Sequence, residues 1–196
     1  MWRRLVALSA SMRLPDSHIG DDLPLGIEVL DGVVHNCPDI IDFLDTLTWA
    51  PSPVGKSAQV AGIRTSTSAF VPILSFRNPE IIHEFARTVW SHLVAYSTAY
   101  GFAIEEIETI SFNRYEPGQN FAPHTDYFPG SQRIVSAVVY LNTVEVGGET
   151  HFTHFNRSVQ AREGRILLFP SNFLFHHSGQ APAHVTKYSA AFWARG

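Results

Sequence analysis

The C-terminal half of the chain is a succession of short segments rich in β-forming residues, and this pattern constrains the fold more than any other feature. Turns that contain Gly or Pro separate most of the segments, which are 104–115, 133–142, 149–155, 165–169, 172–177 and 185–193. Short strands at this spacing are typical of an antiparallel sandwich or barrel. The sequence therefore predicts a doubled or closed antiparallel sheet of the jelly-roll type.

The N-terminal half has two segments with helical periodicity, 36–49 and 78–100. Their apolar residues recur at intervals of three and four, which places them on one helical stripe. Asn36 and Asn78 stand where an N-cap is expected, and Gly101 stands where the second helix should end. We therefore expect two amphipathic helices that pack on the sheet.

The domain organisation follows from these elements. A strand or strand pair is expected over 26–34, and a loop or irregular hairpin over 50–70. No repeat, low-complexity tract or linker divides the 196 residues, a length that suits one core. The sequence predicts an α+β fold in a single domain, 1–196. Its N-terminal strand and two helices (1–103) would support a jelly-roll core (104–196).

Composition and charge narrow the classes of partner. The low charged content of 16% argues against disorder. The net charge of −4 argues against a nucleic acid or an anionic membrane as partner, because the summed field of the protein would attract neither. The apolar run near the start of MWRRLVALSASMRLPDS is short and interrupted by Arg13, so we interpret it as mature sequence. Cys37 is the single cysteine, which rules out an internal disulfide and is compatible with a reducing compartment. We expect a cytoplasmic protein.

The candidate chemistry begins with the stretch FAPHTDYF, which holds His124 and Asp126 between two turns. Residues two apart in a strand point to the same face, so the two side chains could bind one divalent metal. A His-x-Asp pair alone is weak, because it also arises by chance. Downstream, His176, His177 and Lys187 add histidines and a cation. Two histidines and a carboxylate form the facial triad of non-haem Fe(II) oxygenases, and a cation can pair with the far carboxylate of 2-oxoglutarate.

Five motifs in a fixed order make the chain similar to one known family. The sequence resembles the Fe(II)- and 2-oxoglutarate-dependent dioxygenases of the prolyl 4-hydroxylase type, which have a double-stranded β-helix (jelly-roll) fold. The likeness covers nearly all of 110–194 and is looser in the N-terminal half. The motifs that carry it are NRYEPGQNFAPHTDYF, RIVSAVVYLN, VGGETHF, GRILLFPSNFLFHH and TKYSAAFW.

The resemblance implies a catalytic set of four residues. His124 and Asp126 would be the first two iron ligands. The family places its distal histidine ten residues before the basic residue that binds the co-substrate, a spacing that selects His177 over His176. Lys187 would then pair with the 2-oxoglutarate C5 carboxylate. The implied cofactors are Fe(II), 2-oxoglutarate and O2, with ascorbate as a reductant.

The resemblance also implies roles for residues around this set. Tyr115, nine residues before His124, resembles the tyrosine that hydrogen-bonds the co-substrate carboxylate. Tyr140 and Thr150 would line the same subsite. Arg133 and Trp193 match positions that face the substrate in relatives.

The implied reaction is hydroxylation of an unactivated C–H bond, coupled to decarboxylation of 2-oxoglutarate to succinate and CO2. The expected substrate is a proline in a peptide or protein. Relatives that hydroxylate peptidyl proline often have a tyrosine where this chain has Phe121, a substrate-facing position. A free amino acid or other small molecule is therefore an alternative substrate. The long polar segment 50–70 is a candidate lid.

Two rivals come from other classes. A cupin-like jelly roll could bind a metal or small ligand without turnover, but it would not need Lys187 and Tyr115 as a carboxylate clamp. A zinc hydrolase could use the same three ligands, but no glutamate stands beside the His-x-Asp to act as its general base. The oligomeric state is left open by the sequence.

Overall fold

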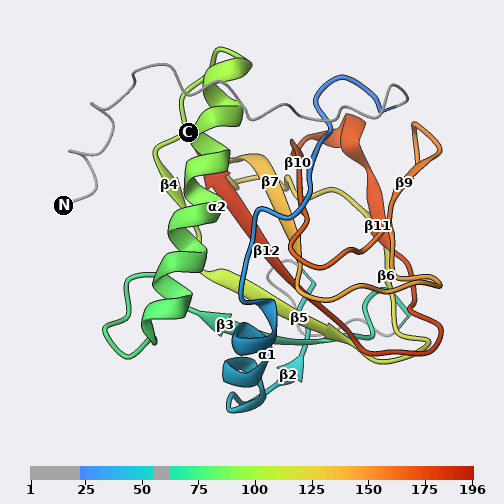
Figure 1. The fold of residues 1–196 in the computed structure, drawn as a ribbon. Coiled ribbons are helices and arrows are strands. Elements are labelled where there is room, and N and C mark those ends of the chain that lie inside the picture. The colour runs from blue at the N-terminus through green and yellow to red at the C-terminus, as the bar shows by residue number, and fades with distance from the viewer. Residues whose placement is uncertain (1–22, 55–61) are drawn as a thin grey trace.

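The structure is a computed structural model that describes residues 23–54 and 62–196. The described chain contains two antiparallel sheets and two α-helices, one short and one long (Figure 1). The interpretation of the first residues as mature sequence lies outside the described range. Within that range, no helix combines the length and the apolar character that crossing a membrane would require.

The larger sheet has eight strands. Its hydrogen-bonded order is β1-β10-β7-β12-β5-β3-β2, and β4 pairs with the end of β12. These strands are β1 (Glu28–Leu30), β2 (Ala50–Pro51), β3 (Thr67–Val71), β4 (Glu106–Ile107), β5 (Ile110–Tyr115), β7 (Arg133–Tyr140), β10 (Ile166–Pro170) and β12 (Lys187–Arg195). Strand β12 lies in the middle, between β7 and β5, so the last segment of the chain joins the two halves of the sheet.

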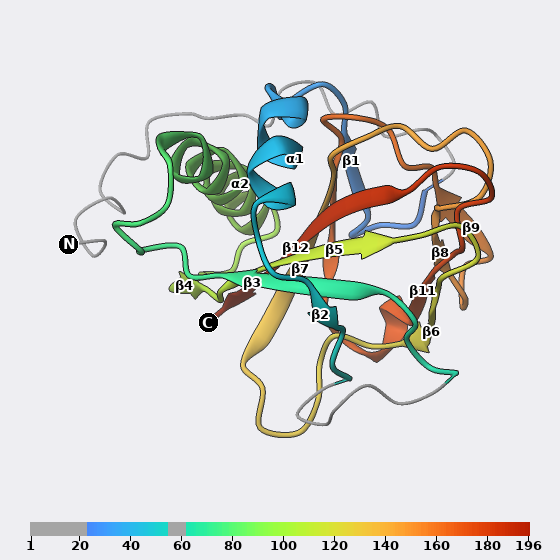
Figure 2. The same ribbon diagram turned by 90° about the horizontal axis from the view of Figure 1, so that it is seen from below.

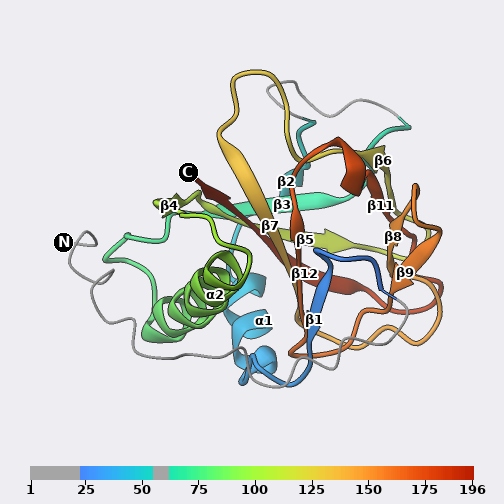
Figure 3. The same ribbon diagram turned by 90° about the horizontal axis from the view of Figure 1, so that it is seen from above.

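The smaller sheet has four strands in the order β6-β11-β8-β9. Its strands are β6 (Phe121–His124), β8 (Thr150–Phe152), β9 (Arg157–Val159) and β11 (His177–Gly179). The helices α1 (Cys37–Asp45) and α2 (Glu80–Ala99) lie on one side of the larger sheet, and the smaller sheet lies on the other (Figures 2 and 3). The larger sheet is therefore covered on both faces.

The two-residue period of the strands divides the larger sheet into two functional faces. On β12, Ala190, Phe192 and Ala194 belong to the apolar core under the helices. The alternate residues Lys187, Ser189, Ala191 and Trp193 line a pocket on the opposite face. One short strand thus contributes both to the core and to the candidate site.

Helix α2 is attached to the sheet through a cluster of aromatic rings. Phe85 lies with its ring centroid 5.9 Å from that of Phe112 on β5 and 5.4 Å from that of Phe192 on β12. All three side chains are buried. Aromatic pairs at these separations add to the free energy gained by burying their area.

Both predicted helices exist, but their ends differ from the prediction. The first helix is α1, which begins at Cys37 and ends at Asp45, and the side chain of Asn36 makes no cap hydrogen bond because that residue has a left-handed backbone. The second is α2, whose N-cap position is Pro79 rather than Asn78. The Asn78 amide instead donates to the carbonyl of Pro72. Both predictions of a side-chain cap are therefore wrong.

Most of the predicted strand segments contain a strand, but 104–115 holds two strands, β4 and β5, and one segment begins differently. A strand was expected over 172–177, but the chain forms a 3-10 turn at Phe173–Phe175 and the strand begins only at His177. The Asn172 side chain accepts a hydrogen bond from the amide of Leu174, which stabilises the turn. The segment 50–70 contains β2 and the start of β3, which pair as an irregular hairpin; its residues 55–61 lie outside the described range.

Replacing Phe85 with Ala should lower the free energy of unfolding by about 3–5 kcal/mol, because it leaves a cavity between α2 and the sheet. Urea denaturation followed by circular dichroism measures this change. The matched control is Phe76→Ala, since Phe76 is 90% exposed and should change stability by less than about 0.5 kcal/mol. Equal losses from the two variants would contradict the packing described here.

Candidate metal centre and active site

The pocket lies between the two sheets, with walls from β5, β7 and β12 on one side and β6, β8 and β11 on the other. Three potential metal ligands meet at one end of it. His124, Asp126 and His177 each offer one ligand atom, and these atoms all lie within 4.8 Å of one another. Among the residues that the structure describes, no other group of three His, Cys, Asp or Glu side chains is arranged in this way.

The two histidines face each other because their strands are neighbours. His124 ends β6, and His177 begins β11 as its direct cross-strand partner. Each Nδ1 lies 2.9 Å from a backbone carbonyl oxygen, that of Ala122 for His124 and that of Phe175 for His177. A carbonyl oxygen only accepts, so each Nδ1 carries the hydrogen. Each Nε2 is then left with a free lone pair, which is the form that a metal ligand needs.

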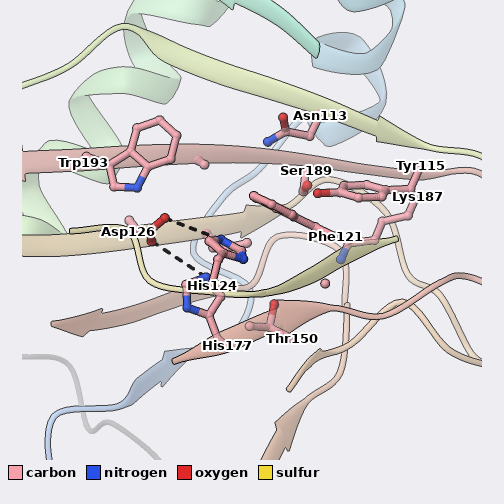
Figure 4. A pocket seen from close by; sticks show the side chains of 14 residues that line it. Asn113, Tyr115, Phe121, His124, Asp126, Thr150, His177, Lys187, Ser189 and Trp193 are labelled. Atoms are coloured by element: carbon pink, nitrogen blue, oxygen red, sulfur yellow. Dashed lines mark ion pairs between the residues drawn. The ribbon is translucent and has the colours of Figure 1, made fainter. Parts of the chain in front are cut away.

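Asp126 lies beyond the end of β6, so the expectation that it shares a strand with His124 is wrong. Its carboxylate nevertheless points between the two rings, with Oδ1 3.8 Å from Nε2 of His124 and Oδ2 3.8 Å from Nε2 of His177 (Figure 4). The side chain is buried, and Ser136 on β7 donates a hydrogen bond of 2.6 Å to Oδ2. The neighbouring strand therefore orients this carboxylate.

Burial and mutual charge set the protonation of this group. Burial, together with the neighbouring His177, lowers the pKa of His124 to about 3, so the ring is neutral near pH 7. Burial alone would raise the pKa of Asp126, but His177, His124 and the Ser136 hydroxyl hold that pKa below its ordinary value. Two imidazoles whose Nδ1 atoms are held by backbone carbonyls, together with a carboxylate, are a donor set that suits a divalent first-row metal. The residues therefore fit a metal ion.

Lys187 begins β12 and lines the pocket with its side chain 3% exposed. Its Nζ donates a hydrogen bond of 2.6 Å to the backbone carbonyl of Gly148. No carboxylate among the described residues forms an ion pair with it. Burial lowers the pKa of Lys187 to about 8, against the opposing influence of Glu149. A buried cation in a pocket wall with only a carbonyl partner suits an anionic ligand.

Three hydroxyl-bearing residues surround Lys187. Its Nζ lies 5.2 Å from the ring centroid of Tyr115 and 5.3 Å from that of Tyr140. Tyr115 and Thr150 line the pocket, whereas Tyr140 is fully buried and donates a hydrogen bond of 2.7 Å to the Thr150 hydroxyl. Tyr140 thereby leaves the Thr150 hydroxyl free to donate into the pocket. The structure thus places Lys187, Tyr115 and Thr150 in the pocket wall, whereas Tyr140 lies behind Thr150, so the expectation that Tyr140 lines the subsite is wrong.

Of the two predicted substrate residues, Trp193 lies near Asp126 and away from Lys187 (Figure 4), whereas Arg133 is not among the residues that line the pocket. Trp193 lines the pocket, and its Nε1 has no hydrogen-bond partner among the described residues. The Arg133 guanidinium stacks on the Trp193 ring at 3.8 Å from the centroid. It also forms an ion pair with Glu108, at 3.0 and 2.7 Å. Arg133 therefore fixes the tryptophan from behind, and the tryptophan is the residue that a ligand would meet.

Phe121 packs directly on the candidate metal site. Its ring is stacked on the His124 ring with centroids 3.6 Å apart, and the Arg64 guanidinium lies over the other side at 4.4 Å. Arg64 in turn donates a hydrogen bond of 2.6 Å to Asn113, a pocket residue on β5. Sequence reasoning missed Arg64 and Asn113. The two-residue period from Tyr115 could have found Asn113, but nothing local marks Arg64.

The adjacent histidines 176 and 177 point into different surroundings. His177 faces Asp126, whereas the His176 ring lies 5.5 Å from that of His154 and its Nδ1 is buried with no partner among the described residues. The 3-10 turn before them ends at Phe175, so His176 is its C-cap residue and His177 is the first residue of the strand.

Comparison with known proteins shows which family the chain is similar to. Residues 110–195 match the model of the 2OG-Fe(II) oxygenase superfamily. A probable prolyl 4-hydroxylase 7 of Arabidopsis thaliana is 35% identical over 53% of this chain and 31% of its own length. Prolyl 4-hydroxylase 2 of the same plant is 31% identical over 69% of this chain and 54% of its own length. The chain thus spans about a third to a half of these relatives.

Solved structures show the same architecture. A Trichoplax adhaerens prolyl hydroxylase in complex with a hypoxia inducible factor peptide fragment has a TM-score of 0.74 at 19% identity, over 87% of this chain and 83% of its own. A Pseudomonas putida prolyl-4-hydroxylase has a TM-score of 0.72 at 20% identity, over 89% and 95%. At these identities the likeness concerns the fold, and it confirms the predicted double-stranded β-helix. Residues 110–195 match the 2OG-Fe(II) oxygenase superfamily, and the chain is similar to prolyl 4-hydroxylases.

Proposed function

We propose that the protein is an Fe(II)- and 2-oxoglutarate-dependent dioxygenase that hydroxylates a prolyl residue in a peptide or protein. The observation that carries the proposal is the pairing of two features in one pocket. The first is the group of two histidines and an aspartate that could hold a metal ion. The second is Lys187, a buried lysine in the same pocket wall that has no carboxylate partner among the described residues. A mere metal-binding barrel would have no need for the second feature.

Each predicted residue has a definite task in this proposal. His124, Asp126 and His177 hold Fe(II) through two Nε2 atoms and a carboxylate oxygen. Lys187 pairs with the C5 carboxylate of 2-oxoglutarate, and Tyr115 and Thr150 donate hydrogen bonds to the same group. When bound, Fe(II) with 2-oxoglutarate and O2 supplies the oxidising power for C–H hydroxylation, with succinate and CO2 as the other products. The protein orients the reactants and excludes water.

The substrate class rests on the relatives and on the chemistry of the pocket wall. The curated relatives are named as prolyl 4-hydroxylases, and one structural neighbour holds a peptide fragment. Trp193 and Phe121 give the site two aromatic walls beside the candidate metal ligands. Such walls suit an apolar ring such as that of proline.

Two further features belong to the proposal. The single, buried cysteine supports a reducing, cytoplasmic compartment. Ascorbate would act as the reductant that returns iron to Fe(II) after turnover without substrate. Omitting ascorbate should therefore shorten the period of linear activity without changing the initial rate.

Replacing Asp126 or His177 with Ala should abolish Fe(II)-dependent succinate formation, since each change removes one of three metal ligands. Isothermal titration with Co(II) under the same conditions should show the loss of the tight site. The matched control is His176→Ala, which removes a neighbouring ring that faces His154 and should retain metal binding. A tight site that survives Asp126→Ala, or one lost in His176→Ala, would contradict the assignment.

Replacing Lys187 with Ala should weaken 2-oxoglutarate binding by roughly a hundredfold, because a buried charge-assisted contact is lost. The wild-type protein should also bind 2-oxoglutarate more weakly as the pH rises above about 8. Below this pKa the lysine is charged and can pair, and above it deprotonation competes with binding, by up to about tenfold per pH unit.

Anaerobic titration of the Fe(II)-loaded protein between pH 7 and 9.5 measures both effects. The control is Lys187→Arg, whose guanidinium stays charged over this range, so its affinity should not depend on pH even if its absolute value is lower. A wild-type affinity that is constant to pH 9.5 would remove Lys187 from the proposed clamp.

A proline-rich peptide should stimulate succinate formation from 2-oxoglutarate by tenfold or more, on the order expected when substrate positions the reacting group. The assay contains Fe(II), ascorbate and air, and mass spectrometry should find a gain of one oxygen atom on a prolyl residue. The control peptide carries Ala in place of each Pro. Turnover that is unaffected by the proline peptide but stimulated by free proline would overturn the peptide assignment and keep the enzyme class.

A further inference from the structure

Asp126 lies outside any strand, although its carboxylate has to keep a fixed position. Strand β6 ends at His124, so no ladder hydrogen bond fixes the backbone of Asp126. Its carboxylate must nevertheless stay between two histidine rings in a buried site. A side chain on a connecting segment would ordinarily sample several rotamers. Contacts from other elements must therefore restrict it.

The contacts come from β7 and from the end of β10. Ser136 on β7 donates 2.6 Å to Asp126 Oδ2, and the Ser136 and Ser171 hydroxyl oxygens are 2.8 Å apart. The carbonyl of Ser171 accepts from the amide of Tyr127, the residue that follows Asp126. Arg133 Nη1 donates to the Asp126 carbonyl at 3.4 Å. Both the backbone and the side chain at Asp126 are thus held from outside.

The hydrogen atoms of this network have one consistent arrangement. A carboxylate only accepts, so Ser136 must donate its single hydroxyl hydrogen to Asp126. Ser171 must then be the donor in its contact with Ser136. Both serines are 1% exposed, and in such surroundings consecutive hydrogen bonds strengthen one another. The direction runs from Ser171 through Ser136 to Oδ2.

We infer that Ser136 and Ser171 form a two-hydroxyl relay that locks the Asp126 carboxylate for metal binding. The relay occupies Oδ2, whereas Oδ1 receives no hydrogen bond from the described residues and is the oxygen left for the metal. The serines are positioning residues, because they touch the ligand and not the metal. This inference rests on the proposed function, since it requires that Asp126 be a ligand.

The relay predicts a graded loss of metal affinity. Ser136→Ala leaves Oδ2 buried without a donor and lets the carboxylate rotate, so the affinity for Co(II) should fall by about 10- to 100-fold. Ser171→Ala retains the bond from Ser136 to Asp126 and should cause a smaller loss. The matched control is Ser97→Ala, because Ser97 is a buried serine on α2 whose hydroxyl donates to the carbonyl of Val94 in its own helix.

The experiment titrates the metal-free, full-length protein with Co(II) alone against a competing chelator. The visible absorption of bound Co(II) is recorded at saturation, since it reports the number and arrangement of ligands and does not respond to stability alone. We expect an altered Co(II) spectrum in Ser136→Ala and the wild-type spectrum in Ser97→Ala. Thermal unfolding confirms that each variant is folded.

The outcomes separate this inference from the proposed function. If Ser136→Ala binds Co(II) within twofold of the wild type and with the same spectrum, the relay is overturned while the metal site stands. If Ser97→Ala loses affinity to the same extent as Ser136→Ala, the relay is also overturned, because the effect would then be global. If the wild-type protein itself shows no tight Co(II) site, both the relay and the proposed function fall.

Discussion

The structure depends on one constraint, which is that the larger sheet has to bury both of its faces. The alternation of side chains along β5, β7 and β12 gives one face to the helices, where Phe112, Phe192 and Phe85 pack together. The opposite face carries polar residues of the pocket, among them Asn113, Lys187 and Ser189. The smaller sheet covers it, and the candidate site lies in the layer between the two sheets.

Burial in this layer gives the site its chemical character. Burial, together with His177, keeps His124 neutral, whereas the two histidines and the Ser136 hydroxyl hold the pKa of Asp126 below its ordinary value, so the candidate metal ligands are preorganised in forms that can bind a cation. Burial also leaves Lys187 with a carbonyl as its hydrogen-bond acceptor, which favours a ligand that brings a carboxylate. Neither arrangement would have these properties on an exposed surface, where water would satisfy the same groups.

Much of the fold and the identity of the clustered residues could be predicted from the sequence, because both follow from local patterns. Turn residues marked the strands, and the order of five motifs selected His124, Asp126, His177 and Lys187. The local argument that placed Asp126 on the strand of His124 was wrong, because the strand ends before it and contacts from β7 replace the ladder.

Other features depend on contacts between distant segments. Ser136 and Ser171 are 35 residues apart, and nothing in the local sequence links either to Asp126. The position of Arg64 beneath Phe121 arises in the same way, from the pairing of Arg64 with Phe121 in an isolated bridge. Long-range packing of this kind leaves no periodicity in the sequence, which is why these residues were missed.

The most direct test is a crystal structure grown without oxygen in the presence of Mn(II) and 2-oxoglutarate, with anomalous diffraction to locate the metal. The account predicts one strong anomalous peak bounded by His124 Nε2, the Asp126 carboxylate and His177 Nε2. It also predicts that the far carboxylate of 2-oxoglutarate lies within hydrogen-bond distance of Lys187 Nζ. A metal bound instead between His154 and His176, or a 2-oxoglutarate carboxylate that does not contact Lys187, would contradict it.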